Sequence, residues 1–297
     1  AIGREINNYL CDKYILRRVS STIKIASDCL YQKPANNCID ETITACLFGG
    51  IDYSADSSAN IIWEYLPGTL SEIDAINENF VNKNIPVSLF KGKQATESNF
   101  MNIFIDEKTS PEILHIATHG FFYPDPELHA NKEKTKVTDD AGKVFFRGSY
   151  SGFGLWQFVK NKNPLMRSGL VLAGANKIWN RKYAGEGEDG VLTALEVSQM
   201  NLLKTDLVVL SACETGLGDI RGSEGVYGLQ RAFKMAGVKY IIMSLWQVPD
   251  KETVEFMETF YKKLLKEKDV RQAFNETQKE MRKKYDPYFW GAFVLIE

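Results

Sequence analysis

A short apolar run that ends at a cysteine is the feature that most constrains the fold of this chain. Leu207–Leu210 (LVVL) is too short for a globular helix and half β-branched, which is typical of a strand buried on both faces. The run ends at Ser211-Ala212-Cys213, and a loop with three glycines follows. Open α/β sheets bind ligands at the carboxyl ends of their strands, so Cys213 stands where a functional group is expected.

A second apolar run ends in the same way, at a histidine. Ile113–Ala117 is followed by Thr118, His119 and Gly120. A nearby imidazole favours the reactive thiolate of a cysteine, so neighbouring strand ends would pair His119 as base with Cys213 as nucleophile. The N–H groups of Gly120 and Cys213 are the candidate oxyanion donors, because glycine lets the backbone approach a substrate closely. From these residues alone, a structural role for Cys213 stays open.

The order of the apolar runs predicts an α/β fold. Strands are expected at 42–50, 86–90, 113–119, 168–174, 207–210, 240–246 and 290–296. Helices are expected between them, and two of these begin with predicted capping boxes, Thr69 with Glu72 and Thr193 with Glu196. This alternation indicates a mostly parallel β-sheet flanked by helices on both faces.

The chain divides into an N-terminal extension, 1–40, packed on one domain, 41–297. Within the domain, 121–165 holds Pro124, Pro126 and a charged run without apolar period, so we predict a mobile insertion there. Its aromatic residues are expected to pack it down, with a substrate groove as the alternative. The N-terminus has neither Met nor a signal peptide, which suggests a fragment of a longer protein.

Composition narrows the class of protein. A net charge of −2 gives no general attraction to nucleic acid, and no apolar run approaches the roughly 20 residues of a membrane span. Five cysteines, an odd number, favour a reducing compartment, so we predict a cytoplasmic protein. His115 and His119 would lie about 13 Å apart on a strand, too far to share a metal ion. We therefore expect no metal and no cofactor, and a partly buried strand residue at His115.

The last two predicted helices, 251–267 and 269–284, carry a surplus of basic side chains. Such a surplus is most often a solvated face, which we favour over a face that docks a partner.

Several ordered sequence blocks resemble one family. They are ILHIATHGFF (113–122), RSGLVLAGAN (167–176), DGVLTA (189–194), LVVLSACETG (207–216), GVYGL (225–229) and SLWQVPD (244–250). Together they resemble the CHAT domain, a caspase-like family, in order from about Tyr9 to the C-terminus. The resemblance implies a caspase-like fold and a cysteine endopeptidase with a His–Cys dyad, in which His119 is the base and Cys213 the nucleophile. It also implies fusion to TPR repeats and a role in bacterial defence or programmed cell death.

The block around the cysteine departs from the caspase pattern, because Ser211 replaces the expected Gln and Glu214 follows Cys213. Caspase-type specificity for Asp is therefore in doubt. The loop from Trp246 to Asp250 resembles a separase loop whose acidic residue lies in the pocket for a basic P1 side chain. We assign Asp250 that role, with a helix N-cap as the alternative, and Trp246 to the pocket wall. Asp189 is a second acidic candidate, with a turn residue as the alternative.

Two further functions remain open. The first is a non-catalytic caspase-like module that regulates or binds a partner. The second is a thiol-dependent acyl transfer to a small molecule, which would need a deep closed pocket. We favour a protein or peptide substrate, since a glycine-rich loop after Cys213 suits an open groove. TPR repeats or a regulatory protein are the expected further partners.

Overall fold

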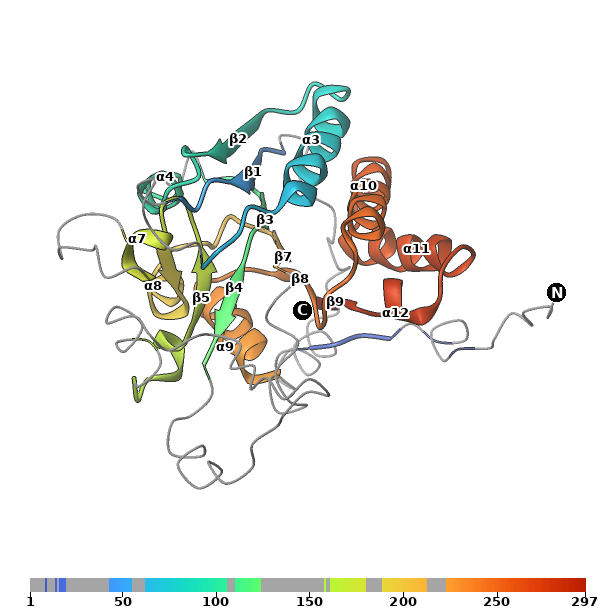
Figure 1. Ribbon diagram of the computed structural model, residues 1–297. Helices are drawn as coiled ribbons and strands as arrows, with labels where there is room; N and C mark the ends of the chain where they lie inside the picture. Colours follow the sequence, from blue (N-terminus) through green and yellow to red (C-terminus); the bar gives the residue numbers. More distant parts are fainter. Residues whose placement is uncertain are drawn as a thin grey trace, which may run out of the picture.

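The computed structural model describes residues 9, 14, 16–19, 43–54, 62–105, 110–123, 158, 161–179, 189–212 and 223–297. Within these residues, six strands form one sheet in the order β2-β1-β3-β7-β8-β9 (Figure 1). Their bounds are β1 Ala45–Ile51, β2 Val87–Gly92, β3 Ile113–Ala117, β7 Leu207–Ser211, β8 Tyr240–Ser244 and β9 Phe293–Ile296. All neighbours pair in parallel except β8 and β9, which are antiparallel. The predicted mostly parallel α/β sheet is confirmed.

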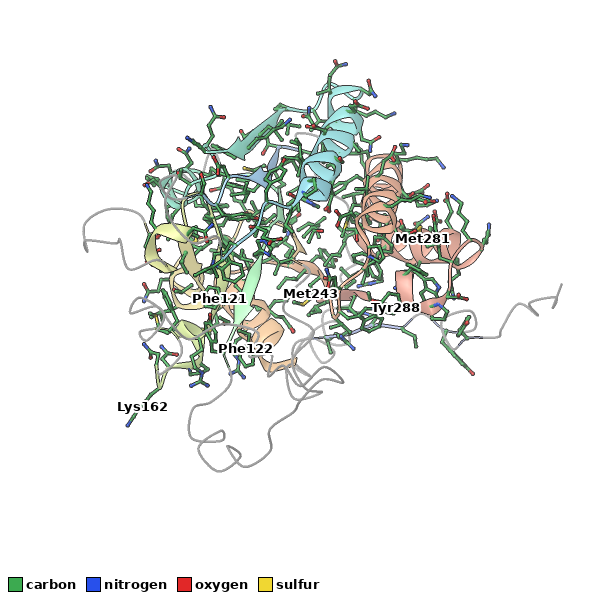
Figure 2. All side chains as sticks on the ribbon, in the orientation of Figure 1. Phe121, Phe122, Lys162, Met243, Met281 and Tyr288 are labelled. Carbon is green, nitrogen blue, oxygen red and sulfur yellow. The ribbon has the colours of Figure 1, made fainter. Side chains whose placement is uncertain are left out.

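Helices cover both faces of this sheet, because successive strand residues point to opposite sides. In β7, Leu207 and Val209 pack with one face, whereas Val208 and Leu210 pack with the other. The first face holds α3 (Pro67–Val81), α10 (Asp250–Glu267) and α11 (Val270–Arg282). The second holds α4 (Glu97–Asn102), α8 (Ala194–Ser198) and α9 (Ser223–Met235). Figure 2 shows Phe121 and Met243 in this interior and Lys162 at the periphery.

A second, smaller sheet branches from the end of β3. In the described part of the chain it has three antiparallel strands in the order β4-β5-β6. These are β4 Gly120–Phe122, β5 Ser168–Val171 and β6 Val191–Thr193. The strand predicted at 168–174 thus lies outside the main sheet and ends at Val171. The capping box of Thr193 and Glu196 is confirmed at the start of α8.

The other predicted capping box, Thr69 with Glu72, is wrong. Helix α3 begins at Pro67, and its N-cap position, Leu66, has no side-chain cap. The Thr69 hydroxyl donates to Leu66 O (2.7 Å) and accepts from Gly50 N (2.9 Å), so it ties the helix to β1. Glu72 is 2% exposed and turns toward the sheet instead of its own helix end.

The two predicted C-terminal helices are confirmed as α10 and α11. Four lysines in α10 or just after α11 form ion pairs with carboxylates at the surface. The pairs are Lys262 with Glu258, Lys263 with Glu280, Lys266 with Glu267, and Lys284 with Glu255. Such exposed pairs contribute about 0–1 kcal/mol each. A short helix, α12 (Pro287–Trp290), precedes β9, so Trp290 is helical where a strand was predicted.

The N-terminal extension is described at few positions. Arg18 forms a parallel bridge with Ile296 of β9, and Glu297 N donates to Arg18 O (3.0 Å). Within the predicted insertion, Phe158 is buried and its ring lies 5.7 Å from that of Phe121, so this aromatic packs inward. The extension and insertion boundaries stay predictions. None of the described helices is long and apolar enough to cross a membrane.

Candidate active site

His119 lies where the two sheets meet. It follows β3 of the main sheet and directly precedes β4 of the smaller one. The neighbouring Thr118 N donates to Ser211 O of β7 (3.3 Å), and Val171 N donates to His119 O (2.9 Å). The backbone on both sides of the histidine is therefore fixed by partners far away in sequence, and the side chain is only 4% exposed.

The imidazole of His119 is oriented by a backbone carbonyl. Its Nε2 lies 2.8 Å from Glu64 O, and a carbonyl oxygen can only accept a hydrogen bond. Nε2 therefore carries the proton, and in the neutral ring the basic lone pair is on Nδ1. The rings of Tyr53 and Trp63 lie 5.0 and 5.1 Å from the imidazole, which restricts its rotation.

The segment that presents Glu64 is held by Asn176. The Asn176 side-chain oxygen accepts from Ile62 N (3.1 Å) and Trp63 N (2.9 Å), and its Nδ2 donates to Trp63 O (3.0 Å). Asn176 begins helix α7 (Asn176–Trp179) and is 2% exposed. Its role could not be predicted, since more than a hundred residues separate the partners and no local pattern marks them.

Thr118 and Tyr53 form a second support behind the histidine. The Thr118 hydroxyl donates to Val171 O, so the Tyr53 hydroxyl must donate to Thr118 Oγ1 (2.8 Å). Tyr53 O in turn accepts from Asn176 N (3.1 Å). Both side chains are buried, and they join the residues that follow β1 and β3 to β5.

The strand that leads to Cys213 is the direct neighbour of β3. Ala117 and Ser211 are register partners in the parallel pair of β3 and β7. The predicted adjacency of these two strand ends is thus confirmed. Ala212 is described and buried, whereas Cys213 lies outside the described residues. The His119–Cys213 dyad stays a prediction, as does an oxyanion role for Gly120, which is buried as the first residue of β4.

Asp250 lies beside the segment that holds His119. It is exposed and is the first residue of α10, where Pro249 is the N-cap, so the N-cap alternative for Asp250 is wrong by one residue. A Cβ at Gly68 would stand 2.2 Å from Asp250 Cγ and Oδ2, so the carboxylate packs on the first turn of α3. Because Gly68 follows Glu64 by only a few residues, Asp250 and His119 contact the same short stretch of chain.

The other two substrate candidates are engaged elsewhere. Trp246 Nε1 donates to Tyr288 O (2.9 Å), which ties this loop to α12. Asp189 Oδ1 accepts from Val191 N (2.8 Å), a turn-forming bond that agrees with the turn alternative. Burial raises the pKa of Asp189 to about 6, against a hydrogen bond from Val191 that lowers it.

A buried polar cluster lies under the same sheet end. Glu72 Oε1 is 3.1 Å from His115 Nε2, and the Ser211 hydroxyl donates to Glu72 Oε2 (3.0 Å). His115 Nδ1 is 3.1 Å from the Tyr261 hydroxyl. Burial, followed by the charge of Glu72, raises the pKa of Tyr261 well above its ordinary value. The prediction that His115 is partly buried is wrong, since its side chain is 0% exposed. Its two partners, Glu72 and Tyr261, lie inside the core, and the histidine is buried with them.

Comparison with known proteins shows the family. The family model for the CHAT domain matches residues 3–297. The chain belongs to the CHAT domain family.

Curated relatives of this CHAT domain are far longer than the chain. It is 32% identical over 304 residues to human (Homo sapiens) tetratricopeptide repeat protein 28, a match that covers 99% of the chain and 11% of the relative. It is 23% identical over 300 residues to the mouse (Mus musculus) protein of the same name, with the same coverage. The chain thus spans about one ninth of the length of these relatives.

The described part of the CHAT domain contains no group of three His, Cys, Asp or Glu side chains that could hold a metal ion. It does contain a free cysteine, Cys46, which is buried in β1. Burial raises the pKa of the Cys46 thiol well above its ordinary value, so this thiol is unreactive in the folded protein. Chemistry at a thiol would therefore have to come from another cysteine.

Proposed function

We propose that this CHAT domain is a cysteine endopeptidase in which His119 activates Cys213. The observation that carries the proposal is the hydrogen bond from His119 Nε2 to Glu64 O, which leaves Nδ1 as the basic atom. That imidazole stands at the strand end next to β7, and β7 ends two residues before Cys213. A base with a fixed tautomer beside a strand-end cysteine is what thiol activation requires.

In this mechanism His119 Nδ1 takes the proton of the Cys213 thiol, and the thiolate attacks the scissile carbonyl carbon. The oxyanion of the tetrahedral intermediate accepts hydrogen bonds from the N–H groups of Gly120 and Cys213. The imidazolium then protonates the leaving amine as the peptide C–N bond breaks. Water, deprotonated by His119, hydrolyses the thioester and restores the thiol.

The proposed specificity is for a basic residue before the cut. Asp250 would receive its charge, Trp246 would form a wall of the pocket, and Asp189 is the second acidic candidate. The exposure of Asp250 and its contact with the segment that orients His119 support the first of these roles. The turn bond and the raised pKa of Asp189 favour Asp250 over Asp189.

We also propose that the domain works together with TPR (tetratricopeptide) repeats, in keeping with the name of its relatives. The proposed role in bacterial defence or programmed cell death rests on the family resemblance, and the proposed cytoplasmic location rests on the small, odd number of cysteines. A regulatory partner that switches the activity belongs to the same proposal.

A peptide library with the wild type, Cys213→Ala and His119→Ala tests the proposal. We expect the wild type to cut after Lys or Arg, and both variants to be inactive while they remain folded and unfold cooperatively. Mass spectrometry after brief alkylation should find Cys213 modified and Cys46 unmodified, an internal control for folding. Equal cleavage by the wild type and Cys213→Ala would refute the peptidase. No cleavage by any of them, with partner binding retained, would favour the non-catalytic module.

A further inference from the structure

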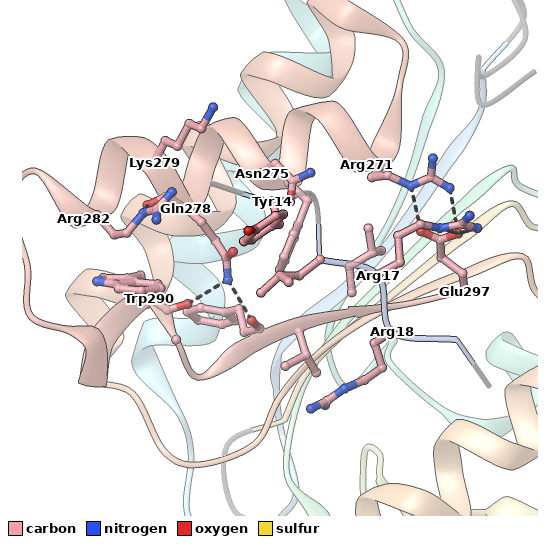
Figure 3. A pocket seen from close by; sticks show the side chains of 16 residues that line it. Tyr14, Arg17, Arg18, Arg271, Asn275, Gln278, Lys279, Arg282, Trp290 and Glu297 are labelled. Atoms are coloured by element: carbon pink, nitrogen blue, oxygen red, sulfur yellow. Dashed lines mark hydrogen bonds and ion pairs between the residues drawn. The ribbon is translucent and has the colours of Figure 1, made fainter. Parts of the chain in front are cut away.

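A groove lies along the edge of the main sheet, away from His119. Strand β9 is the last strand of the six-stranded sheet in the described residues, three places from β3 in the order. Between β9, helix α11 and residues 14 and 16–18 there is a cavity of about 380 Å³ (Figure 3). Arg18 already pairs with the end of this strand, at Ile296 and Glu297, so a bound segment would be held by the side chains that line the groove.

The floor of the groove is apolar. Phe274, Trp290, Phe293 and Leu295 line it, and each is less than 10% exposed. Exposed apolar side chains border it as well, since Tyr14 is 63% and Leu16 57% exposed. This surface would bury apolar side chains of a bound segment.

The rim of the groove is cationic. Among the described lining residues, five basic side chains face one acidic side chain: Arg17, Arg18, Arg271, Lys279 and Arg282 against Glu297. Their formal charges sum to five minus one, or +4. On α11, residues 271, 275, 278, 279 and 282 recur at helical spacing, so the basic side chains share one face with Asn275 and Gln278.

The acidic side chain among the described lining residues, Glu297, is paired with two arginines. Arg17 Nη2 lies 2.5 Å and Arg271 Nη2 2.7 Å from Glu297 Oε2, as the dashed lines in Figure 3 mark. Burial opposes the charge of Glu297, but the hydrogen bonds from Arg271 and Arg17 outweigh it and hold its pKa below the ordinary value. Glu297 thus stays ionised, pairs with Arg17 and Arg271, and fastens residues 16–18 to the end of β9.

The other end of the groove combines charge with an aromatic face. Figure 3 shows Arg282 beside Trp290, and its guanidinium carbon lies 5.2 Å from the ring centroid. Gln278 Nε2 donates to Phe293 O (3.1 Å) and Trp290 O (3.3 Å), so a polar side chain bridges the strand edge here. The α11 carboxylate of Glu280 binds Lys263 of α10, away from the groove lining.

We propose that this groove binds an extended acidic peptide segment of a partner protein. Carboxylates of the segment meet Lys279, Arg282 and Arg18, and its alternate apolar side chains enter the floor between Trp290 and Leu295. The basic rim would attract any anion, but the apolar floor favours a peptide over a nucleic acid, because a peptide has apolar side chains that the floor can bury and a phosphate backbone has none. The groove is separate from His119, so the proposal does not depend on peptidase activity.

Fluorescence anisotropy with short labelled peptides tests the proposal on the full chain. One peptide alternates acidic and apolar residues, and its control replaces every Glu and Asp by Gln and Asn. We expect binding of the acidic peptide only, weakened by added salt. Lys279→Gln and Arg282→Gln should each weaken it by about tenfold, the loss expected for one charged hydrogen bond. Lys262→Gln and Lys266→Gln, on the exposed face of α10, should bind like the wild type.

Three results would overturn the proposal. The first is equal binding of the acidic and the amide peptide. The second is unchanged binding of the acidic peptide by Lys279→Gln and Arg282→Gln, when both still unfold at the wild-type temperature. The third is tighter binding of a labelled single-stranded oligonucleotide that competes with the peptide. Arg282→Gln can also lose stability, because it removes the contact with Trp290. In that case Lys279→Glu decides the test, because Lys279 is exposed and this variant should lose peptide binding while it stays folded.

Discussion

Asn176→Ala is the sharpest test of how the site is built. The substitution removes the side chain that accepts hydrogen bonds from Ile62 N and Trp63 N and donates to Trp63 O. The strands of the main sheet keep their hydrogen bonds, because Asn176 lies at the start of α7, outside both sheets. The segment that carries Glu64 O should therefore loosen while the sheet that carries His119 stays folded.

The expected cost follows from the three lost hydrogen bonds. Each contributes about 0.5–1.5 kcal/mol net, so their sum is roughly 1.5–4.5 kcal/mol. Ile62 is exposed and Trp63 half-buried, so water can take the place of the lost side-chain partner at some of these backbone groups. The expected cost therefore lies in the lower half of that range. A cost of about 2 kcal/mol shifts the ratio of ordered to loosened segment about 30-fold.

Two measurements check this prediction. Amide hydrogen exchange at Trp63 should accelerate by about the same 30-fold factor. The ¹⁵N shifts of the His119 ring should move from the Nε2–H tautomer toward a mixture, and kcat/KM should fall if the domain cleaves peptides. Asn201→Ala is the matched control, since Asn201 is exposed and its side chain accepts from Leu203 N in a surface turn (3.3 Å).

The reasoning is refuted if Asn176→Ala leaves Trp63 exchange and the His119 tautomer as in the wild type. Loss of activity with both unchanged would mean that Asn176 acts elsewhere. Global unfolding would instead appear as faster exchange throughout the main sheet, which the exchange data separate from local loosening.

Three further predictions concern buried or crowded charges. Glu72→Gln should lower the free energy of unfolding by about 1–3 kcal/mol in urea, because an amide has one acceptor oxygen in place of two and leaves the Ser211 hydroxyl or the His115 ring without its partner in the core. Gly68→Ala places a methyl group 2.2 Å from the Asp250 carboxylate and 2.6 Å from Asp250 Cβ, so the start of α10 must shift and cleavage after Lys or Arg should fall by up to about 100-fold. Asp189 binds its proton more tightly in the folded state, where its pKa is raised to about 6 from 3.8, so wild-type stability should fall as pH rises between these values. Asp189→Asn should lack that fall in pH-dependent urea titrations, and an equal fall in the variant would contradict the assignment.

Much of the fold could be predicted from local patterns. Apolar runs rich in β-branched residues, such as Leu207–Leu210, correspond to buried parallel strands. The capping box of Thr193 and Glu196 and the helical spacing of α10 and α11 were equally clear, because caps and apolar periods act within a few residues. His119 at a strand end could be singled out for the same reason.

Local patterns failed where a side chain served a distant partner. Glu72 matches a capping box in spacing, yet it pairs with His115 across the core, since a buried histidine and a serine of β7 satisfy its carboxylate better than a helix end in water. No spacing rule reveals that the small antiparallel sheet takes up the strand at Ser168–Val171.

The sequence by itself therefore determined the strands of the main sheet, the long helices and the residues that stand at strand ends, but not β4 and β6 of the small sheet. Only the tertiary structure decided which groups surround and orient those residues. The Glu64 carbonyl that fixes the His119 tautomer, the Asn176 side chain that holds it, and the basic groove beside β9 are assembled from segments far apart in the chain. Hydrogen bonds and charge depend on distance in space, and only the packed fold brings those groups within reach of one another.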